Sequence, residues 1–249
     1  MHGPNAEKIF ETGAVMLVFV AVFLFGGRFY PLRALSGDRR SLLSFSAGIS
    51  LAYVFVHLMP ELSSARETFV QSTLLPTLFD GRVIYFVALL GFLLFFGLDH
   101  FSKTARRAAA ERDGGAPDYD IKVAGFAGYV ALVSYLLVNN LDNSAIASTA
   151  YATAMAVHFL TFDHDFREDS PKAYVRRGHL LLAAAAPLGW GLGLLFTLPA
   201  ATLALMLAFL SGGVIVNSMI AELPSEKRGK FLPLLAGSII YSAVLIPLA

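Results

Sequence analysis

The 249-residue sequence contains no cysteine, only one tryptophan and only 15% charged residues. The absence of cysteine excludes disulfide bonds and thiolate metal ligands, although it does not identify the cellular compartment. A net charge of +1 gives no basic surface for a nucleic-acid partner. In place of charge, 56% of the residues are hydrophobic and the mean hydropathy is +0.65. This composition is typical of an integral membrane protein and lies outside the range of soluble domains.

The apolar residues form blocks that are long enough, or nearly so, to cross the roughly 30 Å hydrocarbon core of a bilayer. The sequence therefore predicts an all-α integral membrane protein, with residues 1–249 forming a single transmembrane domain of eight helices. The predicted helices are Gly13–Tyr30, Leu42–Glu61, Val83–Phe101, Val123–Asn143, Ala145–Phe162, His179–Leu198, Ala201–Ala221 and Phe231–Leu248.

The basic residues lie on one side of this predicted bundle. All 19 Lys and Arg residues except Lys8, Arg66 and Arg82 fall near the loops after the first, third, fifth and seventh helices. Because basic loops stay in the cytoplasm, both termini are expected to be extracytoplasmic. The segment before the first helix has no small-residue cleavage site, so no removable signal peptide is expected.

Polar residues interrupt the fourth and fifth predicted helices. Asn139, Asp142 and Asn143 share one helical face, and His158 approaches them if the two helices pack antiparallel. Placing a carboxylate at the bilayer centre costs about 2.5 to 3.5 kcal/mol, so such a side chain is rarely found there without an interaction partner or a function. Carboxylate, amide oxygen and imidazole together suit a divalent transition metal. The alternative is an interhelical hydrogen-bond network that only holds the helices together.

Further polar residues lie towards the ends of the second and seventh predicted helices. His57 and Glu61 flank Pro60, which is expected to kink the helix. They either mark the outer helix end or form a vestibule for a cation. The seventh helix ends similarly, with Glu222 before Pro224, which suggests a repeat of the kind found in transporters.

Charged residues gather at both inner helix ends. Asp99 and His100, at the end of the third helix, are expected to be solvated at the interface, and the segment 102–120 is expected to form a flexible inner loop. A charge run follows the fifth helix and is expected to be a solvated loop. It consists of Asp163, His164, Asp165, Glu168 and Asp169.

Several segments resemble, in order and spacing, the ZIP (Zrt/Irt-like) family of divalent metal transporters. AGISLAYVFVHLMPEL resembles the second helix of the family, ALLGFLLFFGLDH the third, APLG at Ala186–Gly189 the sixth, and LSGGVIVNSMIAELPSE the seventh. The resemblance covers nearly the whole chain. It implies an eight-helix bundle with both termini outside, in agreement with the loop charges.

The metal motifs of that family are only partly retained. Its fourth helix typically reads His-Asn-x-x-Asp or Glu, which places ligands at Asn139 and Asp142 but a valine, Val138, at the histidine position. In the fifth helix the ligand histidine falls at His158. The other ligand positions are occupied by Phe159 and Phe162, with Asp163 next in line, and the glutamate of the sixth helix is replaced by Ala186.

An alternative register of the fifth helix uses His164, Asp165 and Glu168 as ligands. That register fits the chemistry better, but it would bury Arg167, Asp169 and Lys172 in the following helical turns, so His158 is preferred.

The resemblance implies a transporter that carries zinc, or iron, manganese or cadmium, through a reduced site at Asn139, Asp142 and His158 by moving one helix bundle against another. A non-transporting relative with a structural or regulatory role is the alternative. An intramembrane metallohydrolase is disfavoured because no His-rich helix pair is present. The expected surroundings are membrane lipid in a plasma membrane, the inner membrane of a bacterium, and a homodimer is left open.

Overall fold

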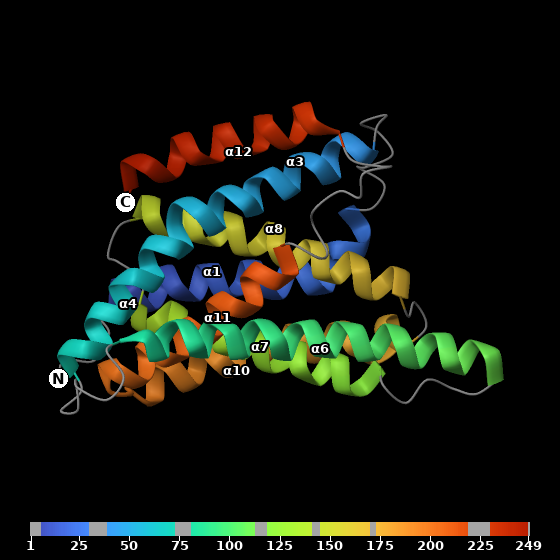
Figure 1. Cartoon of the computed structure of the whole chain (residues 1–249), viewed down its shortest axis with the longest axis horizontal. Helices are drawn as coiled ribbons and strands as arrows, with labels where there is room; N and C mark the ends of the chain where they lie inside the picture. Colours follow the sequence, from blue (N-terminus) through green and yellow to red (C-terminus); the bar gives the residue numbers. More distant parts are fainter. Residues whose placement is uncertain are drawn as a thin grey trace.

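The computed structural model describes residues 6–29, 39–72, 81–112, 119–140, 145–169, 173–218 and 230–248, and these residues form helices without any strand. Eight helical rods lie side by side along the long axis of the molecule (Figure 1). The start of the first rod and the end of the last lie at the same end of the bundle (Figure 1). In the described part of the chain, the predicted all-α fold and its count of eight are confirmed.

Four of the rods are composite. The first two are α1 (Ala6–Phe25) with the 3₁₀ turn η1 (Gly26–Phe29), and α3 (Arg39–Ala52) joined by the π-helical turn η2 (Tyr53–Leu58) to α4 (Met59–Ser72). The other two are the π-helical turn η3 (Tyr174–Gly178) with α10 (His179–Leu195), and α12 (Phe231–Leu245) with the 3₁₀ turn η5 (Ile246–Leu248). The remaining four rods are the single helices α6 (Arg82–Arg112), α7 (Tyr119–Asn140), α8 (Ala145–Asp169) and α11 (Ala200–Asn217).

Pro60 does not end the second rod. A proline inside a helix lacks the N–H group for the preceding turn and its ring crowds the carbonyl four residues earlier. The π-helical turn at Tyr53–Leu58 widens the helix just before Pro60, and α4 then continues to Ser72. The prediction that His57 and Glu61 mark a helix end is therefore wrong, because they lie within one continuous rod.

Two more helices extend beyond their predicted ends. Helix α6 was expected to end at Phe101 but continues to Arg112, and its charged end projects beyond its neighbours (Figure 1). The segment from Ser102 to Arg112 is rich in Ala, Arg, Lys and Glu, which are strong helix formers, and it contains no glycine or proline. Helix α8 continues through the charge run to Asp169.

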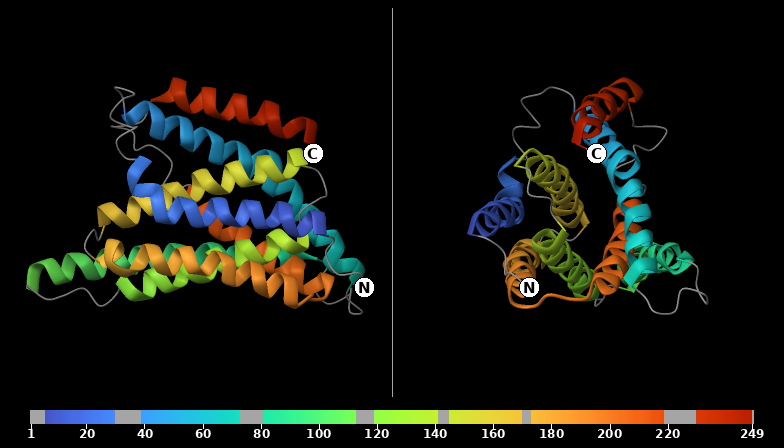
Figure 2. Two further views of the ribbon diagram at one scale, coloured as in Figure 1. Left: turned by 180° about the vertical axis from the view of Figure 1, so that it is seen from behind. Right: turned by 90° about the vertical axis from the view of Figure 1, so that its left-hand side faces the viewer.

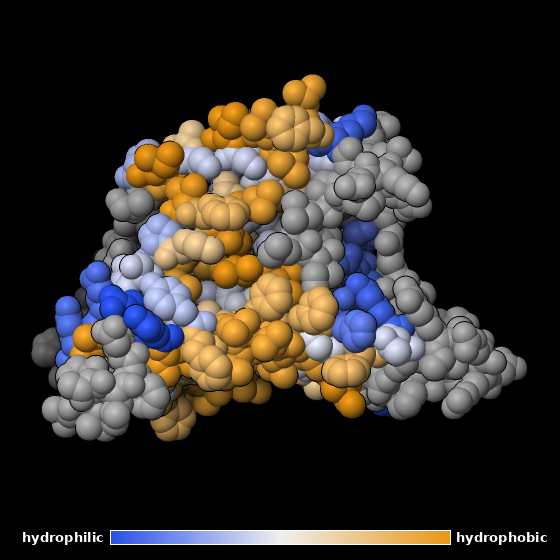
Figure 3. Space-filling model, in the orientation of Figure 1, coloured by the Kyte–Doolittle hydropathy of each residue, from blue (hydrophilic) through white to orange (hydrophobic). Residues whose placement is uncertain are grey.

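The exterior of the molecule is compatible with an integral membrane protein. Five helices are long and apolar enough to cross a membrane, and α11 and α12 are shorter apolar helices. On the face shown in Figure 3, an apolar band covers the middle of the bundle, with hydrophilic residues towards both ends. Many large side chains of α6 and α12, including Phe86, Leu93, Leu232 and Ile239, are exposed. Such an apolar surface would cause non-specific association in water, whereas the acyl chains of lipids can cover it.

Three helix pairs approach so closely that a glycine of one helix touches the backbone of the other. At each of these glycines an added Cβ would overlap a carbonyl oxygen of the partner helix, so only glycine permits the approach. The contacts are Gly48 on Leu234 and Gly237 on Phe45 between α3 and α12, Gly91 on Phe209 and Gly212 on Ala88 between α6 and α11, and Gly189 on Ala131 between α10 and α7.

The packing divides the rods into two groups (Figure 2). In the first bundle, α10 packs along α7 and α1, and α1 packs along α8. In the second bundle, α11 packs along α6 and α4, and α12 packs along α3. Across the boundary, smaller contacts join α7 to α6 and α11, and α8 to α3. Each glycine-mediated pair lies inside one bundle, so the closest packing is within the bundles.

Candidate functional site

His158 of α8 lies at the centre of the candidate site and is only 2% exposed. Its Nε2 atom and the hydroxyl of Tyr129 on α7 share a hydrogen bond of 3.0 Å. The ring of Phe162 packs edge-on against the imidazole at 4.5 Å between centroids, and Phe159 follows in the same helix. The histidine therefore has a polar partner, Tyr129, within an aromatic surrounding.

Polar residues of the second bundle approach the same region. The ring of Tyr53 lies 5.2 Å from that of His57, whose Nε2 is 3.5 Å from a carboxylate oxygen of Glu61. Tyr129 lies in the surroundings of Tyr53, and Glu61 in those of Tyr151 of α8. Tyr241 of α12 lies beside the backbone of Ala154 in α8. We refer to these residues as the boundary cluster: Tyr129, Tyr151 and His158 from the first bundle, and Tyr53, His57, Glu61 and Tyr241 from the second.

The boundary cluster combines imidazole, carboxylate and phenol groups, which are suited to binding a partly hydrated cation or to passing protons. Among the described residues, however, no three His, Asp or Glu side chains come together as a metal-binding group. The cluster is therefore a polar crossing between the bundles and not a preformed metal centre.

Asn139 lies near the C-terminal end of α7. Its side-chain amide donates a hydrogen bond of 3.1 Å to the carbonyl of Tyr135, one turn earlier in the same helix. The expected approach of Asn139 to His158 stays a prediction. Asp142 and Asn143 lie outside the described residues, so the ligand role of Asp142 stays a prediction.

The positions where the family carries further ligands are filled by apolar packing. Val138, Phe159, Phe162 and Ala186 are all buried in the core. Phe159 packs on Phe19 of α1 at 4.9 Å between ring centroids. These side chains occupy space that a second metal ion and its ligands would need.

Asp163 forms the centre of a buried ion pair and is only 1% exposed. Arg167 donates to both of its carboxylate oxygens, from Nε at 2.7 Å and from Nη2 at 3.0 Å. The hydroxyl of Tyr174 donates to Oδ1 at 2.8 Å, and Gly26 packs directly against the carboxylate. The expectation of a solvated loop here is wrong, because α8 continues to Asp169 and Asp163 is buried with these partners.

This finding answers the objection to the alternative register for Arg167, which is accommodated inside the helix, whereas the side chain of Asp169 and all of Lys172 lie outside the described part of the chain. His164 is buried and Asp165 half-buried, while the side chain of Glu168 lies outside the described part of the chain. Glu222 also lies outside it, so its predicted role is neither supported nor contradicted.

A second ion pair crosses the boundary at the predicted inner end. Lys122 of α7 lies 3.0 Å from Oδ1 of Asp99 in α6, and Lys103 lies 2.6 Å from Oδ2. The Lys122 ammonium also lies over the ring of Phe166 at 5.2 Å. Asp99 is thus held by two cations, in contrast to the simple interfacial solvation expected from the sequence.

The sequence analysis did not single out the tyrosines of the boundary cluster. Each is a large, mostly apolar residue within an apolar helix, so it does not stand out in a hydropathy profile. What could have pointed to these tyrosines is that a buried tyrosine hydroxyl usually has a hydrogen-bond partner.

No family model, curated protein or solved structure matches this chain.

Proposed function

We propose that the protein is a membrane transporter of divalent transition-metal cations, with zinc as the first candidate, that works by moving its first bundle against its second. The observation that carries this proposal is the boundary cluster, because it places polar groups from both bundles at their boundary, where the packing is less extensive than inside either bundle.

The arrangement of the contacts favours such a movement. Glycine-mediated contacts tie α3 to α12, α6 to α11 and α7 to α10, which makes each bundle a unit. Two units with a thinner contact can shift as rigid bodies, as occurs in transporters that alternate access to a site. The polar groups at the boundary would then become accessible to a cation from one side at a time.

His158 is the described residue best suited to hold the cation, since imidazole favours zinc and related metals over calcium. Tyr129 fixes the orientation of the imidazole, as hydrogen-bond partners of metal-binding histidines commonly do. Asp142 is proposed as the carboxylate ligand. With so few ligands, affinity and selectivity are expected to be lower than in a complete binuclear site.

Metal uptake into sealed proteoliposomes tests the function directly. Wild type is expected to take up zinc, and Asp142→Ala and His158→Ala to abolish most of the uptake. Empty liposomes provide the background. If uptake by both variants equals that of the wild type, the assignment of this site is wrong.

Because the chain lacks cysteine, the bundle movement can be tested with introduced disulfides. Gly125 of α7 faces Leu98 of α6 across the boundary, and a Cβ at Gly125 would lie 3.8 Å from Leu98 Cγ. Oxidation of Leu98→Cys with Gly125→Cys is expected to stop transport, and reduction to restore it. Phe95→Cys with Gly213→Cys, a pair inside the second bundle, is the control and should transport equally in both states.

A non-transporting role is the second candidate. It is favoured by the apolar side chains at the family's ligand positions and by the pairing of His158 with Tyr129. In that case, the purified protein would bind no divalent ion in calorimetry and Asp142→Ala would change neither uptake nor stability.

A further inference from the structure

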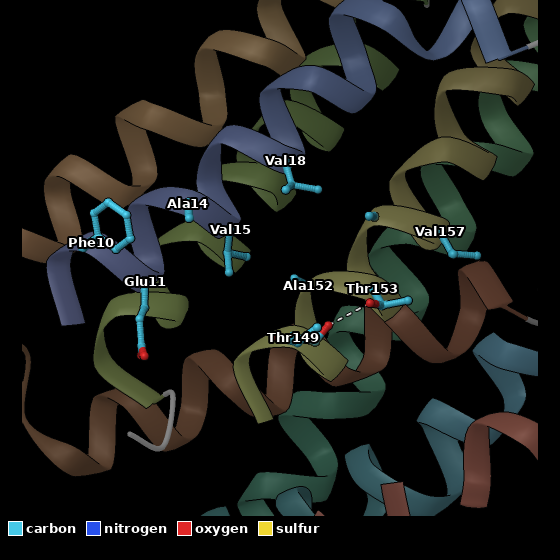
Figure 4. Close-up of a pocket in the computed structure, with 10 residues that line it drawn as sticks. Phe10, Glu11, Ala14, Val15, Val18, Thr149, Ala152, Thr153 and Val157 are labelled. Carbon is cyan, nitrogen blue, oxygen red and sulfur yellow. Dashed lines mark hydrogen bonds between the residues drawn. The ribbon is translucent and has the colours of Figure 1, made fainter. Parts of the chain in front are cut away.

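A groove of about 570 Å³ runs between α1 and α8 and is open to the surface (Figure 4). Ala14, Ala152 and Ala156 line it, and their short side chains keep the two helices from filling the space between them. Val18 and Val157 line one end, whereas Glu11 and Thr149 lie towards the other (Figure 4). From Glu11 to Val18 the helix rises by about 10 Å. The groove is thus apolar along most of its length, with a carboxylate at one end.

If α1 spans a membrane, the features around Glu11 place this end of the groove at the level where the membrane meets water. Trp190, the only tryptophan of the chain, donates from its indole nitrogen to the hydroxyl of Thr12 at 3.0 Å. Tryptophan is enriched at the headgroup level, where its ring is partly in lipid and its N–H is satisfied. Phe10, beside Glu11, is 80% exposed. The valines at the other end therefore lie deeper, among the acyl chains.

We propose that this groove binds one acyl chain of a membrane phospholipid whose headgroup carries a primary ammonium, with the ammonium at the Glu11 carboxylate. A primary ammonium offers both charge and N–H donors to a carboxylate. The trimethylammonium of a choline lipid has no N–H donor, and the anionic headgroup of a glycerol lipid would be repelled. This inference rests on the membrane location in the proposed function, but not on metal transport.

Native mass spectrometry of the full chain in detergent tests the proposal. The probe is an equimolar mixture of phosphatidylethanolamine, phosphatidylcholine and phosphatidylglycerol with identical acyl chains. Wild type is expected to retain the ethanolamine lipid roughly threefold to fivefold over each of the others, the size expected of a partly exposed ion pair. Equal retention of all three lipids would overturn the proposal.

Two variants and a control test separately the headgroup contact at Glu11 and the binding of lipid in the groove. Glu11→Gln should lose the preference while still binding lipid, and Ala156→Leu, which fills the groove, should lose bound lipid of every headgroup. Glu7→Gln, an exposed carboxylate one turn earlier and outside the groove, should keep the preference. A preference that survives Glu11→Gln contradicts the assigned headgroup contact, and lipid binding that survives Ala156→Leu contradicts the groove. These results hold whether or not the protein transports metal, because the assay measures retained lipid alone.

Discussion

Asp163 is the side chain whose surroundings matter most for the stability of the first bundle. It connects Arg167 of the same helix with Tyr174 of η3, and Arg167 also donates to the carbonyl of Phe23 in α1 at 3.4 Å. One carboxylate therefore links three rods through hydrogen bonds. Removing its charge leaves the guanidinium without its counterion in a poorly hydrated place.

We expect Asp163→Asn to lower the free energy of unfolding by about 3 kcal/mol, because breaking a buried pair from one side costs roughly 3 to 5 kcal/mol. Replacing both partners, with Asp163→Asn and Arg167→Met, should cost less than Asp163→Asn alone, since no unpaired charge remains. Chemical unfolding in detergent measures both. An unchanged stability of Asp163→Asn would contradict the role of the pair.

At the residue scale, the sequence identified groups by type but not by partner. It drew attention to His158, because an imidazole in an apolar helix is unusual, but it placed Asp163 in a solvated loop. It could not show that Tyr129 would face His158 or that Tyr174 would reach Asp163. Such pairings depend on how helices distant in sequence are rotated against each other.

Helix α10 provides a matched test of close helix packing. Gly189 touches the backbone of Ala131 in α7, whereas an added Cβ at Gly191, half a turn further on, would meet nothing within 4 Å. We expect Gly189→Ala to destabilise the protein by about 1 to 3 kcal/mol through overpacking. Gly191→Ala should be neutral or slightly stabilising, because alanine is the better helix former. Thermal unfolding distinguishes them, and equal melting temperatures would show that the α7–α10 contact adapts freely.

At the scale of elements, hydropathy predicted the existence of all eight rods but misplaced several ends. A helix that crosses the hydrocarbon core must be apolar over the thickness of that core, so its apolar block is easily recognised in the sequence. Charge runs mislead because a helix continues through them when partners satisfy the charges, as Arg167 of the same helix and Tyr174 of η3 do for Asp163. Pro60 misleads for a similar reason, because the π-helical turn before it makes room for the proline ring and the helix continues.

The ion pair between Asp99 and Lys122 is expected to influence the position of one bundle relative to the other. If the bundles shift, this contact across the boundary favours the arrangement seen here, so weakening it should reduce the population of that arrangement. We expect Lys122→Gln to slow disulfide formation between Leu98→Cys and Gly125→Cys by a few fold, as suits a partly exposed pair.

The matched control is Lys103→Gln, which removes the other cation from the same Asp99 but leaves the contact across the boundary intact. In the Lys103→Gln variant, the disulfide between Leu98→Cys and Gly125→Cys should form as fast as in the protein that keeps both Lys103 and Lys122. Equal slowing in both variants would mean that the boundary ion pair has no special influence.

The division into two bundles could not be predicted from the sequence, although its ingredients are visible there. Gly48, Gly91, Gly189, Gly212 and Gly237 stand out within apolar helices, but a glycine does not reveal which helix it will meet. Partner choice depends on complementary surfaces along whole helices, and here it joins rods that are distant along the chain.

The pairing of α3 with α12 also sets an order for biosynthesis. The glycine face of α3 is made early, but its partner α12 is made much later. At about 5 to 20 residues per second, the ribosome needs roughly ten to forty seconds after α3 to reach the end of α12. Throughout that interval Gly48 has no α12 backbone to pack against, so the α3–α12 contact is among the latest to form in the second bundle.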